Sequence, residues 1–432
     1  MRDFLPEDVR RRQYVIGVIA DVYQKYGFEP LETPAVENLE TLQGKYGEEG
    51  DRLIFKILKR GEGAETGQAD LALRYDLTVP LARVVAEYRS TLPKFFKRYQ
   101  VQPVWRADRP QKGRFREFYQ CDVDAIGSTS MTVEAELLSA AADVFLALGF
   151  NEFKIAVNHR KLLNAVLRHV GIPPDLHGPA LVAMDKVDKI GAAGVQKEFE
   201  ARGLPGRAAA DLAELLGSAR IGRLAQLAEQ LDDEGKAAVS DLRQLFDLTS
   251  HTSAGPHVEL DGYLARGLSY YTGPIFEIQV PDLAGSLGGG GRYDNLIGMF
   301  SGENIPASGI SLGLERILVV MSERKMFPEN VVSTPADVMV VQWFANRTPL
   351  YLDFATELRK AGLRVELYPE SPVEDGKKVG DKQFKYASAR GIPFVAVIGA
   401  DELANNTVTV KNMKTGEQQA IARPEVTKWL NS

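Results

Sequence analysis

The segment from Arg106 to Gln120, RADRPQKGRFREFYQ, carries four arginines, one lysine and one glutamate. Strands are expected on either side of it, over residues 94–106 and 116–126, and a proline and a glycine between them indicate a loop. The planar guanidinium group of arginine can donate two hydrogen bonds to one phosphate. The segment therefore predicts a phosphate-binding loop, and the alternative is an exposed hairpin that is merely basic.

A second segment, Arg266 to Glu277, has the sequence RGLSYYTGPIFE. A cation beside the adjacent tyrosines Tyr270 and Tyr271 can bind an anion and orient a planar polar group. By residue type alone, packing within a strand explains two adjacent tyrosines better than ligand binding does.

Two glycine-rich segments follow, GGGGRYD from Gly288 and GISLGLER from Gly309. Glycine allows the backbone to approach a ligand closely. Neither segment matches the dinucleotide fingerprint or the phosphate loop that ends in Lys-Ser/Thr. If ATP binds here, its phosphates are held by a different arrangement of the backbone. A glycine run alone is often only a turn.

A third kind of group is the pair Asp76 and Thr78 in the segment LRYDLTVP. Residues two apart in an extended chain face the same side, so this carboxylate and hydroxyl can hold an ammonium group together. A helix cap near Pro80 is an equally good explanation of the same residue types.

Length and composition limit the class of protein. The 432 residues suit two to four domains, and the 44% hydrophobic and 25% charged residues are ordinary for a globular protein. Cys121 is the only cysteine, which excludes an internal disulfide framework and a cysteine-based metal site and suggests a reducing compartment. Without a signal-peptide core or a long apolar run, we expect a cytoplasmic protein with no membrane partner.

The net charge of −6 excludes a generic basic coat for nucleic acid. Basic residues nevertheless gather at 94–116, where Asp108 is the lone acid, and at 377–390. These clusters indicate two sites that bind phosphate groups. The alternative is that both are charged surfaces exposed to solvent.

The elements expected around these segments come in a mixed order. Apolar spacing predicts helices at 8–26 and 132–148, and an alanine- and leucine-rich helical insertion from 159 to about 248. Residues 28–36 are expected to form an edge strand because they contain two prolines. From residue 336 onward, strands and helices alternate, which is typical of a small α/β domain with a largely parallel sheet.

In this order the segments resemble the class II aminoacyl-tRNA synthetases and, among them, the histidyl-tRNA synthetase family, over nearly the whole chain. The helix and strand ending at Pro34 look like the first class motif, residues 94–126 like the second, and residues 309–318 like the third. RGLSYY and GGGRYD are similar to signatures particular to the histidine enzymes.

The resemblance implies an α+β fold: a class II antiparallel sheet flanked by helices, with a helical insertion and a C-terminal α/β anticodon-binding domain. The expected catalytic core comprises residues 1–158 and 250–325. The insertion is expected at 159–249, a linker at 326–335 and the anticodon-binding domain at 336–432.

The resemblance also implies the activity. ATP and L-histidine would form histidyl-adenylate, and the histidyl group would pass to the 3' end of tRNA(His). The expected cofactors and partners are ATP as a substrate, Mg²⁺, histidine, tRNA(His) and a second copy of the chain, with no DNA. Among the residues that match the family motifs, Arg106 and Arg266 are expected to be catalytic.

The remaining roles are carried over position by position. Asp124 and Tyr271 are expected to bind the imidazole, and Gln120 both the α-ammonium and the carboxylate. No metal ligand is assigned. The histidine-binding residues implied are Asp76, Thr78, Arg106, Gln120, Asp124, Arg266, Tyr270 and Tyr271. The ATP-binding residues implied are Arg106, Arg114, Glu117, Phe118 and Arg316.

This chain departs from one branch of the family, which has Glu where Asp76 and Asp124 stand and Gly at Cys121 or Asp122. The shorter carboxylates affect the detailed geometry of the ammonium and imidazole contacts. A non-catalytic, histidine-sensing regulator of histidine biosynthesis is the main alternative. Such paralogues usually lose the second-motif arginines and the C-terminal domain, both of which this chain has.

Overall fold

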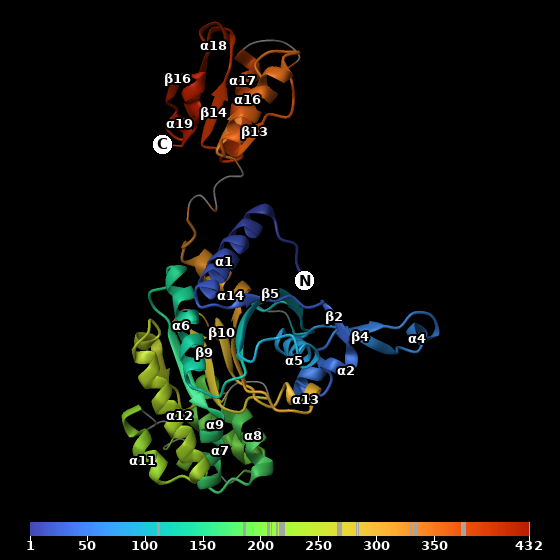
Figure 1. Cartoon of the computed structure of the whole chain (residues 1–432), viewed down its shortest axis with the longest axis vertical. Helices are drawn as coiled ribbons and strands as arrows, with labels where there is room; N and C mark the ends of the chain where they lie inside the picture. The colour runs from blue at the N-terminus through green and yellow to red at the C-terminus, as the bar shows by residue number, and fades with distance from the viewer. Residues whose placement is uncertain are drawn as a thin grey trace. The chain divides into compact units, whose positions relative to one another are not determined.

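An eight-stranded sheet forms the centre of the first structural unit, Met1–Met326. In the computed structural model its strand order is β1-β5-β6-β11-β10-β9-β7-β8 (Figure 1). Neighbours are antiparallel except for the outer pairs β1–β5 and β7–β8. The strands are β1 (Glu29–Pro30), β5 (Phe96–Trp105), β6 (Glu117–Ile126), β7 (Lys154–His159), β8 (Val258–Leu260), β9 (Pro274–Gln279), β10 (Gly288–Arg292) and β11 (Ala307–Gly313).

The structure describes residues 1–109, 113–184, 187–204, 208, 210–212, 215, 221–265, 270–281, 283, 285–328, 331, 336–372 and 377–431. A second structural unit comprises Phe327–Ser432. No helix in these ranges is both long and apolar enough to cross a membrane.

Three helices pack against the central strands of the sheet: α1 (Pro6–Lys25), α6 (Thr132–Ala147) and α14 (Leu314–Glu323). In β6 every residue from Gln120 to Ile126 is buried, as in a strand covered on both faces. Successive side chains of a strand point to opposite faces. Cys121 and Val123 therefore lie on one face, and the polar Gln120, Asp122 and Asp124 share the other.

Helix α1 begins with Pro6, which suits the first turn because its missing N–H would have no helical partner. It ends before Gly27, whose φ of +76° is a conformation that favours glycine. The expected helix at 8–26 is thereby confirmed. The expected strand at 28–36 is mostly wrong, since β1 comprises only Glu29–Pro30.

A small three-stranded sheet, in the order β2-β4-β3, lies beside the large one, and only its strand β4, near Leu71, is expected from the sequence. The other two strands are too short for a clear alternation of polar and apolar residues. The elements of this region are β2 (Val36–Asn38), α2 (Leu39–Leu42), α3 (Gly47–Arg52), β3 (Lys56–Leu58), α4 (Glu62–Glu65), β4 (Ala69–Leu73), α5 (Thr78–Glu87) and, from later in the chain, α13 (Gly298–Ser301).

Between β7 and β8 the described residues are helical, as the alanine- and leucine-rich composition predicts. Asp232 caps α12 by accepting a hydrogen bond from the Gly235 N–H at 2.9 Å, and Arg168 of α7 contacts the same carboxylate at 2.7 Å. The helices are α7 (Arg160–His169), α8 (His177–Met184), α9 (Val187–Ala201), α11 (Leu224–Glu229) and α12 (Asp233–Ser250). The proposed domain boundaries stay a prediction.

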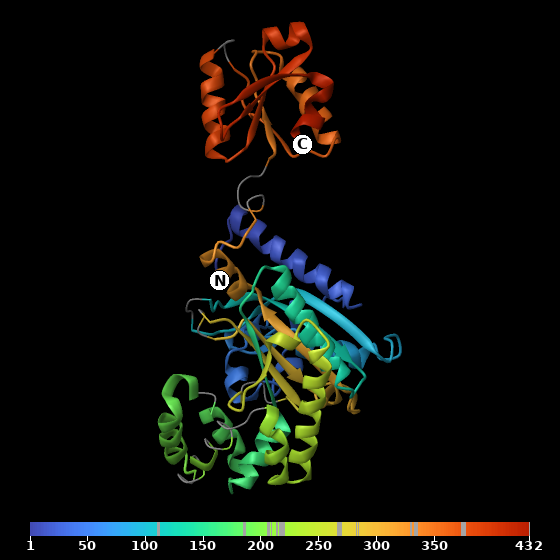
Figure 2. The same ribbon diagram turned by 90° about the vertical axis from the view of Figure 1, so that its left-hand side faces the viewer.

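The second unit has a five-stranded sheet in the order β13-β12-β14-β15-β16. Alternate residues of β12 face two cores: Val338 packs with Phe354 of α16, and Met339 packs with Ala387 of α17. Helices therefore cover both faces (Figure 2). The elements are β12 (Val338–Val340), α16 (Thr348–Lys360), β13 (Val365–Leu367), α17 (Lys377–Ala389), β14 (Phe394–Val397), α18 (Ala400–Asn405), β15 (Thr407–Asn412), β16 (Gln418–Ala422) and α19 (Val426–Leu430).

The mainly antiparallel sheet with its flanking helices and the C-terminal α/β unit confirm the expected α+β fold class. In the second unit, β12 is parallel to both β13 and β14, as the alternation of strands and helices indicated. Strands β15 and β16 add an antiparallel hairpin that the sequence analysis missed.

The close packing of β10 on β11 gives a testable consequence. A methyl group on Gly290 would lie 2.0 Å from the Gly309 carbonyl oxygen and 2.7 Å from Cα of Ile310, which are backbone atoms that cannot rotate away. Gly290→Ala is expected to lower the free energy of unfolding by ~1–3 kcal/mol or more, measured by urea unfolding. Gly17→Ala in α1, where a methyl group meets nothing within 4 Å, is the control and should stabilise by ~0.5–1 kcal/mol. Equal stability of Gly290→Ala and the wild type would contradict the packing.

Candidate active site

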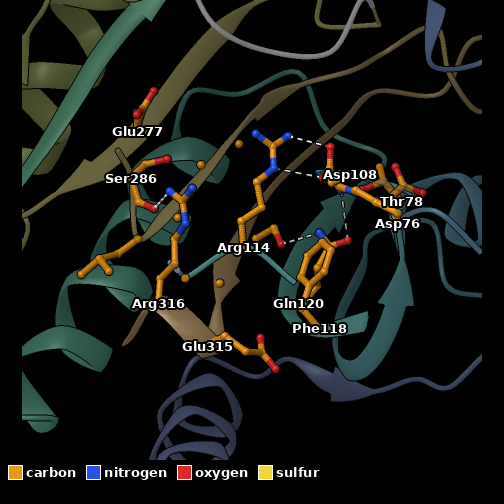
Figure 3. A pocket seen from close by; sticks show the side chains of 18 of the residues that line it. Asp76, Thr78, Asp108, Arg114, Phe118, Gln120, Glu277, Ser286, Glu315 and Arg316 are labelled. Carbon is orange, nitrogen blue, oxygen red and sulfur yellow. Dashed lines mark hydrogen bonds and ion pairs between the residues drawn. The ribbon is translucent and has the colours of Figure 1, made fainter. Parts of the chain in front are cut away.

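A cavity of about 400 Å³ opens over the polar face of β6, beside β9, β10 and β11. Figure 3 shows Asp76, Thr78 and Asp108 on one side of it, Glu277, Ser286 and Arg316 on the other side, and Arg114 between them. Its lining includes Asp76, Thr78, Arg106, Asp108, Gly113, Arg114, Phe115, Phe118, Gln120, Tyr270, Tyr271, Phe276, Glu277, Ser286, Leu287, Gly288, Gly289, Gly290, Ser311, Gly313, Glu315 and Arg316.

Asp76 forms the acidic end and stands just before α5. One carboxylate oxygen accepts hydrogen bonds from the Tyr46 hydroxyl at 3.0 Å and the Val79 N–H at 3.1 Å. The other faces the Tyr270 hydroxyl at 3.5 Å. Burial raises the pKa of Asp76, and the Val79 N–H and Arg106 oppose that rise. Asp76 therefore accepts from an N–H in the first turn of α5 and also lines the cavity. Thr78 is the first residue of that helix, so the expected extended pair is not formed, and the binding of an ammonium group stays a prediction.

Arg106 follows β5 and lies in the middle of the cavity. Its Nε donates to the Tyr75 carbonyl at 3.0 Å, and Nη2 lies 3.5 Å from Oε1 of Gln120. The guanidinium also lies 4.4 Å from the Tyr75 ring centre and 5.1 Å from that of Phe118. These contacts fix the direction of the positive charge.

Two further arginines line the cavity, and Figure 3 shows Arg316 on the side away from Asp76 and Arg114 between them. Arg114 donates two hydrogen bonds of 3.0 Å to the carboxylate of Asp108, and Arg316 donates through Nη1 to the Ser286 carbonyl at 2.5 Å (Figure 3). The side chain of Arg114 is about half exposed. Because a single acid holds Arg114, an incoming phosphate can compete for its guanidinium group.

Glycines keep the space between the two ends free of side chains. Gly288, Gly289 and Gly290 of β10 line the cavity, so the strand contributes only backbone there. On β11, a Cβ at Gly309 would lie 2.0 Å from Oδ1 of Asp124. The glycine runs in this chain are therefore strand positions beside the cavity, and the simple turn that the sequence left open is excluded for them.

Asp124 lies in a buried cluster next to the cavity and is not part of its lining. The Tyr293 hydroxyl donates to one of its oxygens, and Nη2 of Arg98 lies 2.9 Å from the other. Asp122 lies on the same face of β6, 4.0 Å from the same guanidinium nitrogen. Burial raises the pKa of both carboxyls, that of Asp122 to about 7, and the Arg98 charge opposes the rise.

Most of the residues implied by the sequence come together in this cavity. Arg266, the expected catalytic arginine, lies outside the described residues. Glu117, at the start of β6, and Asp124 do not line the cavity. The implied residues that do line it are Asp76, Thr78, Arg106, Arg114, Phe118, Gln120, Tyr270, Tyr271 and Arg316.

Several lining residues were missed by sequence reasoning: Asp108, Glu277, Ser286, Ser311 and Glu315. Asp108 had a usable signal, because one acid in a strongly basic segment suggests a paired arginine. Glu315 precedes Arg316 directly and had no separate signal. Among the described residues, no group of three or more His, Cys, Asp or Glu side chains is placed to hold a metal ion.

Comparison with known proteins agrees with this geometry. The family model described as "Histidyl-tRNA synthetase" matches residues 1–317, and the one described as "Anticodon binding domain" matches residues 337–432. A "Histidine--tRNA ligase" of Flavobacterium johnsoniae is 42% identical, over 97% of this chain and 95% of the relative. This chain belongs to the histidyl-tRNA synthetase family.

Solved structures support the membership. A histidyl-tRNA synthetase from Nostoc sp. PCC 7120 superposes with a TM-score of 0.84 at 31% identity, covering 100% of this chain and 97% of that one. A Bacillus halodurans protein described as an ATP phosphoribosyltransferase regulatory subunit/histidyl-tRNA synthetase has a TM-score of 0.70 at 22% identity, over 89% and 94% of the two chains. The second likeness concerns the fold alone.

Glu315 gives the histidyl-tRNA synthetase fold a pH-sensitive contact at the rim of the cavity. Both of its carboxylate oxygens accept from the Tyr119 N–H, at 3.1 and 3.0 Å. Burial raises the pKa of Glu315 to about 7, while the positive charges of Arg2 and Arg12 lower it. In the unfolded chain this carboxyl ionises at a lower pH, so the folded chain holds the extra proton between the two pKa values.

Glu315→Gln tests this protonation. Between about pH 4.5 and pH 7 the ionisation of Glu315 should lower the free energy of unfolding of the wild type as pH rises. Glutamine keeps one acceptor for the Tyr119 N–H and cannot ionise. The melting temperature of Glu315→Gln relative to wild type should therefore be higher at pH 8 than at pH 5. A difference that is the same at both pH values would show that Glu315 does not titrate in this window.

Proposed function

We propose that this chain is a histidine–tRNA ligase. It activates L-histidine with ATP to give histidyl-adenylate and pyrophosphate, and then transfers the histidyl group to the 3' end of tRNA(His), releasing AMP. The observation that carries the proposal is one cavity that joins an acidic, tyrosine-lined end to an arginine-lined end in a chain of this family.

The acidic end suits the amino acid. Asp76, with Thr78 beside it, presents a buried carboxylate and a hydroxyl to an α-ammonium group. Tyr271 lies at the same end, and burial together with the charges of Asp122 and Asp124 raises its pKa. Its phenol therefore stays neutral and can donate a hydrogen bond to an imidazole nitrogen. A site that must satisfy polar groups on both sides rejects analogues that lack them by about 10⁴–10⁵.

Asp124 enters this assignment indirectly. Among the described residues, one of its oxygens accepts from the Tyr293 hydroxyl, and the other lies 2.9 Å from Arg98 without a hydrogen-bond partner. Asp124 either receives the imidazole after a small rearrangement or acts through Tyr293. The proposal keeps Asp124 as an imidazole-binding residue and Tyr271 as its partner.

The arginine end suits ATP. Histidine's carboxylate oxygen attacks the α-phosphorus, the bond to the bridging oxygen breaks, and pyrophosphate leaves. Both reactants are anions, so fixed positive charge lowers the barrier by stabilising the charge on the phosphate oxygens. We assign this role to Arg106 and Arg316, contact with the terminal phosphates to Arg114, and stacking on the adenine to Phe118, all of which line the cavity. The roles of Arg266 and Glu117 rest on the family motifs.

Mg²⁺ fits this site only as part of the substrate. Three carboxylates lie near the arginines, and all of them have partners. Asp108 pairs with Arg114, Glu315 accepts from the Tyr119 N–H, and Glu277, on the Arg316 side of the cavity in Figure 3, is not free either. Guanidinium groups repel a dication. We therefore propose that Mg²⁺ arrives on the phosphates of ATP, and that this chain's own residues supply the arginine contacts.

The tRNA partner and the assembly follow from family membership. We propose that residues 336–432 contact the anticodon and that residues 159–249 contact the acceptor arm. We further propose a cytoplasmic homodimer. Val36, Leu71 and Tyr88 are apolar side chains 39%, 37% and 50% exposed, and they line one groove with Leu31 and Pro34 at the end of the segment that resembles the first class motif, as an unpaired dimer face would.

The alternative, a histidine-sensing regulator without catalytic activity, would require different residues in the cavity. A histidine sensor needs the acidic end alone, whereas this chain also has Arg106, Arg114 and Arg316 around the same space. The second unit, matched by an anticodon-binding model, is likewise unnecessary in a sensor.

ATP–pyrophosphate exchange with single amino acids tests the function. Histidine alone should support exchange, and Arg316→Ala should lower kcat by about 10²–10³, because one preorganised donor to the transition state is lost. Arg89→Ala is the control, since Arg89 is 52% exposed and pairs with Glu303 on the surface. Exchange with another amino acid, or full activity of Arg316→Ala, would contradict the proposal.

A further inference from the structure

Gln120 is held on its inner side by two neighbours. Its Nε2 lies 2.7 Å from Oγ of Ser311 and 3.4 Å from Oδ1 of Asp122. Its Oε1 lies on the side of Arg106, 3.5 Å from Nη2. The amide nitrogen thus points into the sheet, and the amide oxygen is the end nearer the ligand space.

Sheet register places these groups together. Ser311 of β11 pairs with Asp122 of β6, and Gln120 precedes Asp122 by two residues on the same face. On the other side of β6, Gln100 of β5 pairs with Asp122. Asp122 is 2% exposed and lies 4.0 Å from the Arg98 guanidinium, so its position is fixed by both neighbouring strands.

The direction of the Gln120 amide follows from the chemistry of these partners. An ionised carboxylate only accepts hydrogen bonds, whereas an amide has a donor end and an acceptor end. Turning the amide by 180° would set its oxygen against the Asp122 carboxylate in a buried place, at the cost of a buried unsatisfied acceptor. Asp122 therefore favours one of the two amide orientations.

We propose that Asp122, together with Ser311, is a positioning residue that commits Gln120 to present its amide oxygen to the α-ammonium group of histidine. Gln120 then binds the ammonium group of histidine, and the arginines bind its carboxylate. An amide side chain could contact either group, so this orientation restricts Gln120 to one of the two. Asp122 itself does not line the cavity and acts only through Gln120.

The inference rests on the proposed function. It is tested with two histidine analogues, each of which lacks one of the two charged groups of the amino acid. Histidinol keeps the ammonium and imidazole groups and lacks the carboxylate. Imidazolepropionate keeps the carboxylate and imidazole and lacks the ammonium. Their inhibition constants in histidine-dependent pyrophosphate exchange report separately on the two ends of the amino acid. The assay is run at pH 8, above the pKa of about 7 of Asp122.

Asp122→Asn removes the charge that selects the amide orientation, because asparagine can either accept from Gln120 or donate to it. We expect KM for histidine and Ki for histidinol to rise together, by about tenfold, the loss of one hydrogen bond to a charged group. The kcat at saturating histidine and the Ki of imidazolepropionate should stay near wild type. Ser311→Ala should act in the same direction, by about threefold.

Ser308→Ala is the matched control, since Ser308 is a fully buried serine of the same strand outside the cavity lining. It should leave all three constants unchanged. Should Asp122→Asn fail to fold, the comparison of Ser311→Ala with Ser308→Ala decides the question.

Three results would overturn the inference: an unchanged histidinol Ki, a rise in the imidazolepropionate Ki alone, or equal rises for both inhibitors with a lower melting temperature. The last would mean that Asp122 only stabilises the fold. Absence of histidine-dependent exchange in the wild type is a separate outcome, which would overturn the proposed function itself.

Discussion

Repulsion between two anions is the constraint around which this cavity is built. A carboxylate must approach a phosphate, so positive charge has to be fixed in place before either arrives. Arg106 donates to the Tyr75 carbonyl and Arg316 donates to the Ser286 carbonyl, and both of these acceptors are uncharged. Charge that is oriented in advance costs no reorganisation during the reaction. The carboxylate of Asp76 at the other end offers the ammonium group of the same amino acid an anchor, which orients its carboxylate.

The central sheet makes this separation of charge geometrically simple. Alternation on β6 gives one face to Gln120 and the two aspartates, while the other face packs against helices. The close packing of β10 and β11 beside the cavity depends on glycines, because added side chains there would meet backbone atoms or buried neighbours. Gly309 is the sharpest case, since any side chain there would displace the Asp124 carboxylate.

Residue types and spacing predicted much of this arrangement. The long strands 96–105 and 117–126, the helix beginning at Thr132 and the alternating C-terminal elements carry strong periodic signals. The short strands β2 and β3 carry no such signal and were missed, whereas β4 matches the short strand expected near Leu71, just before the helix at Thr78. The buried partners of Asp124 were equally hidden. Arg98 and Tyr293 contact its two oxygens, and they reach it through sheet register and tertiary packing. Nothing local in the sequence shows these contacts, and Asp124 was expected to bind the ligand directly.

A structure with histidine and a non-hydrolysable ATP analogue bound is the most direct test of the two-ended cavity. The α-ammonium nitrogen should lie about 3 Å from the Asp76 carboxylate and from the amide oxygen of Gln120. The phosphates should contact the guanidinium groups of Arg106 and Arg316. Histidine bound with its carboxylate toward Asp76, or phosphates bound away from both arginines, would contradict the arrangement of charge described here.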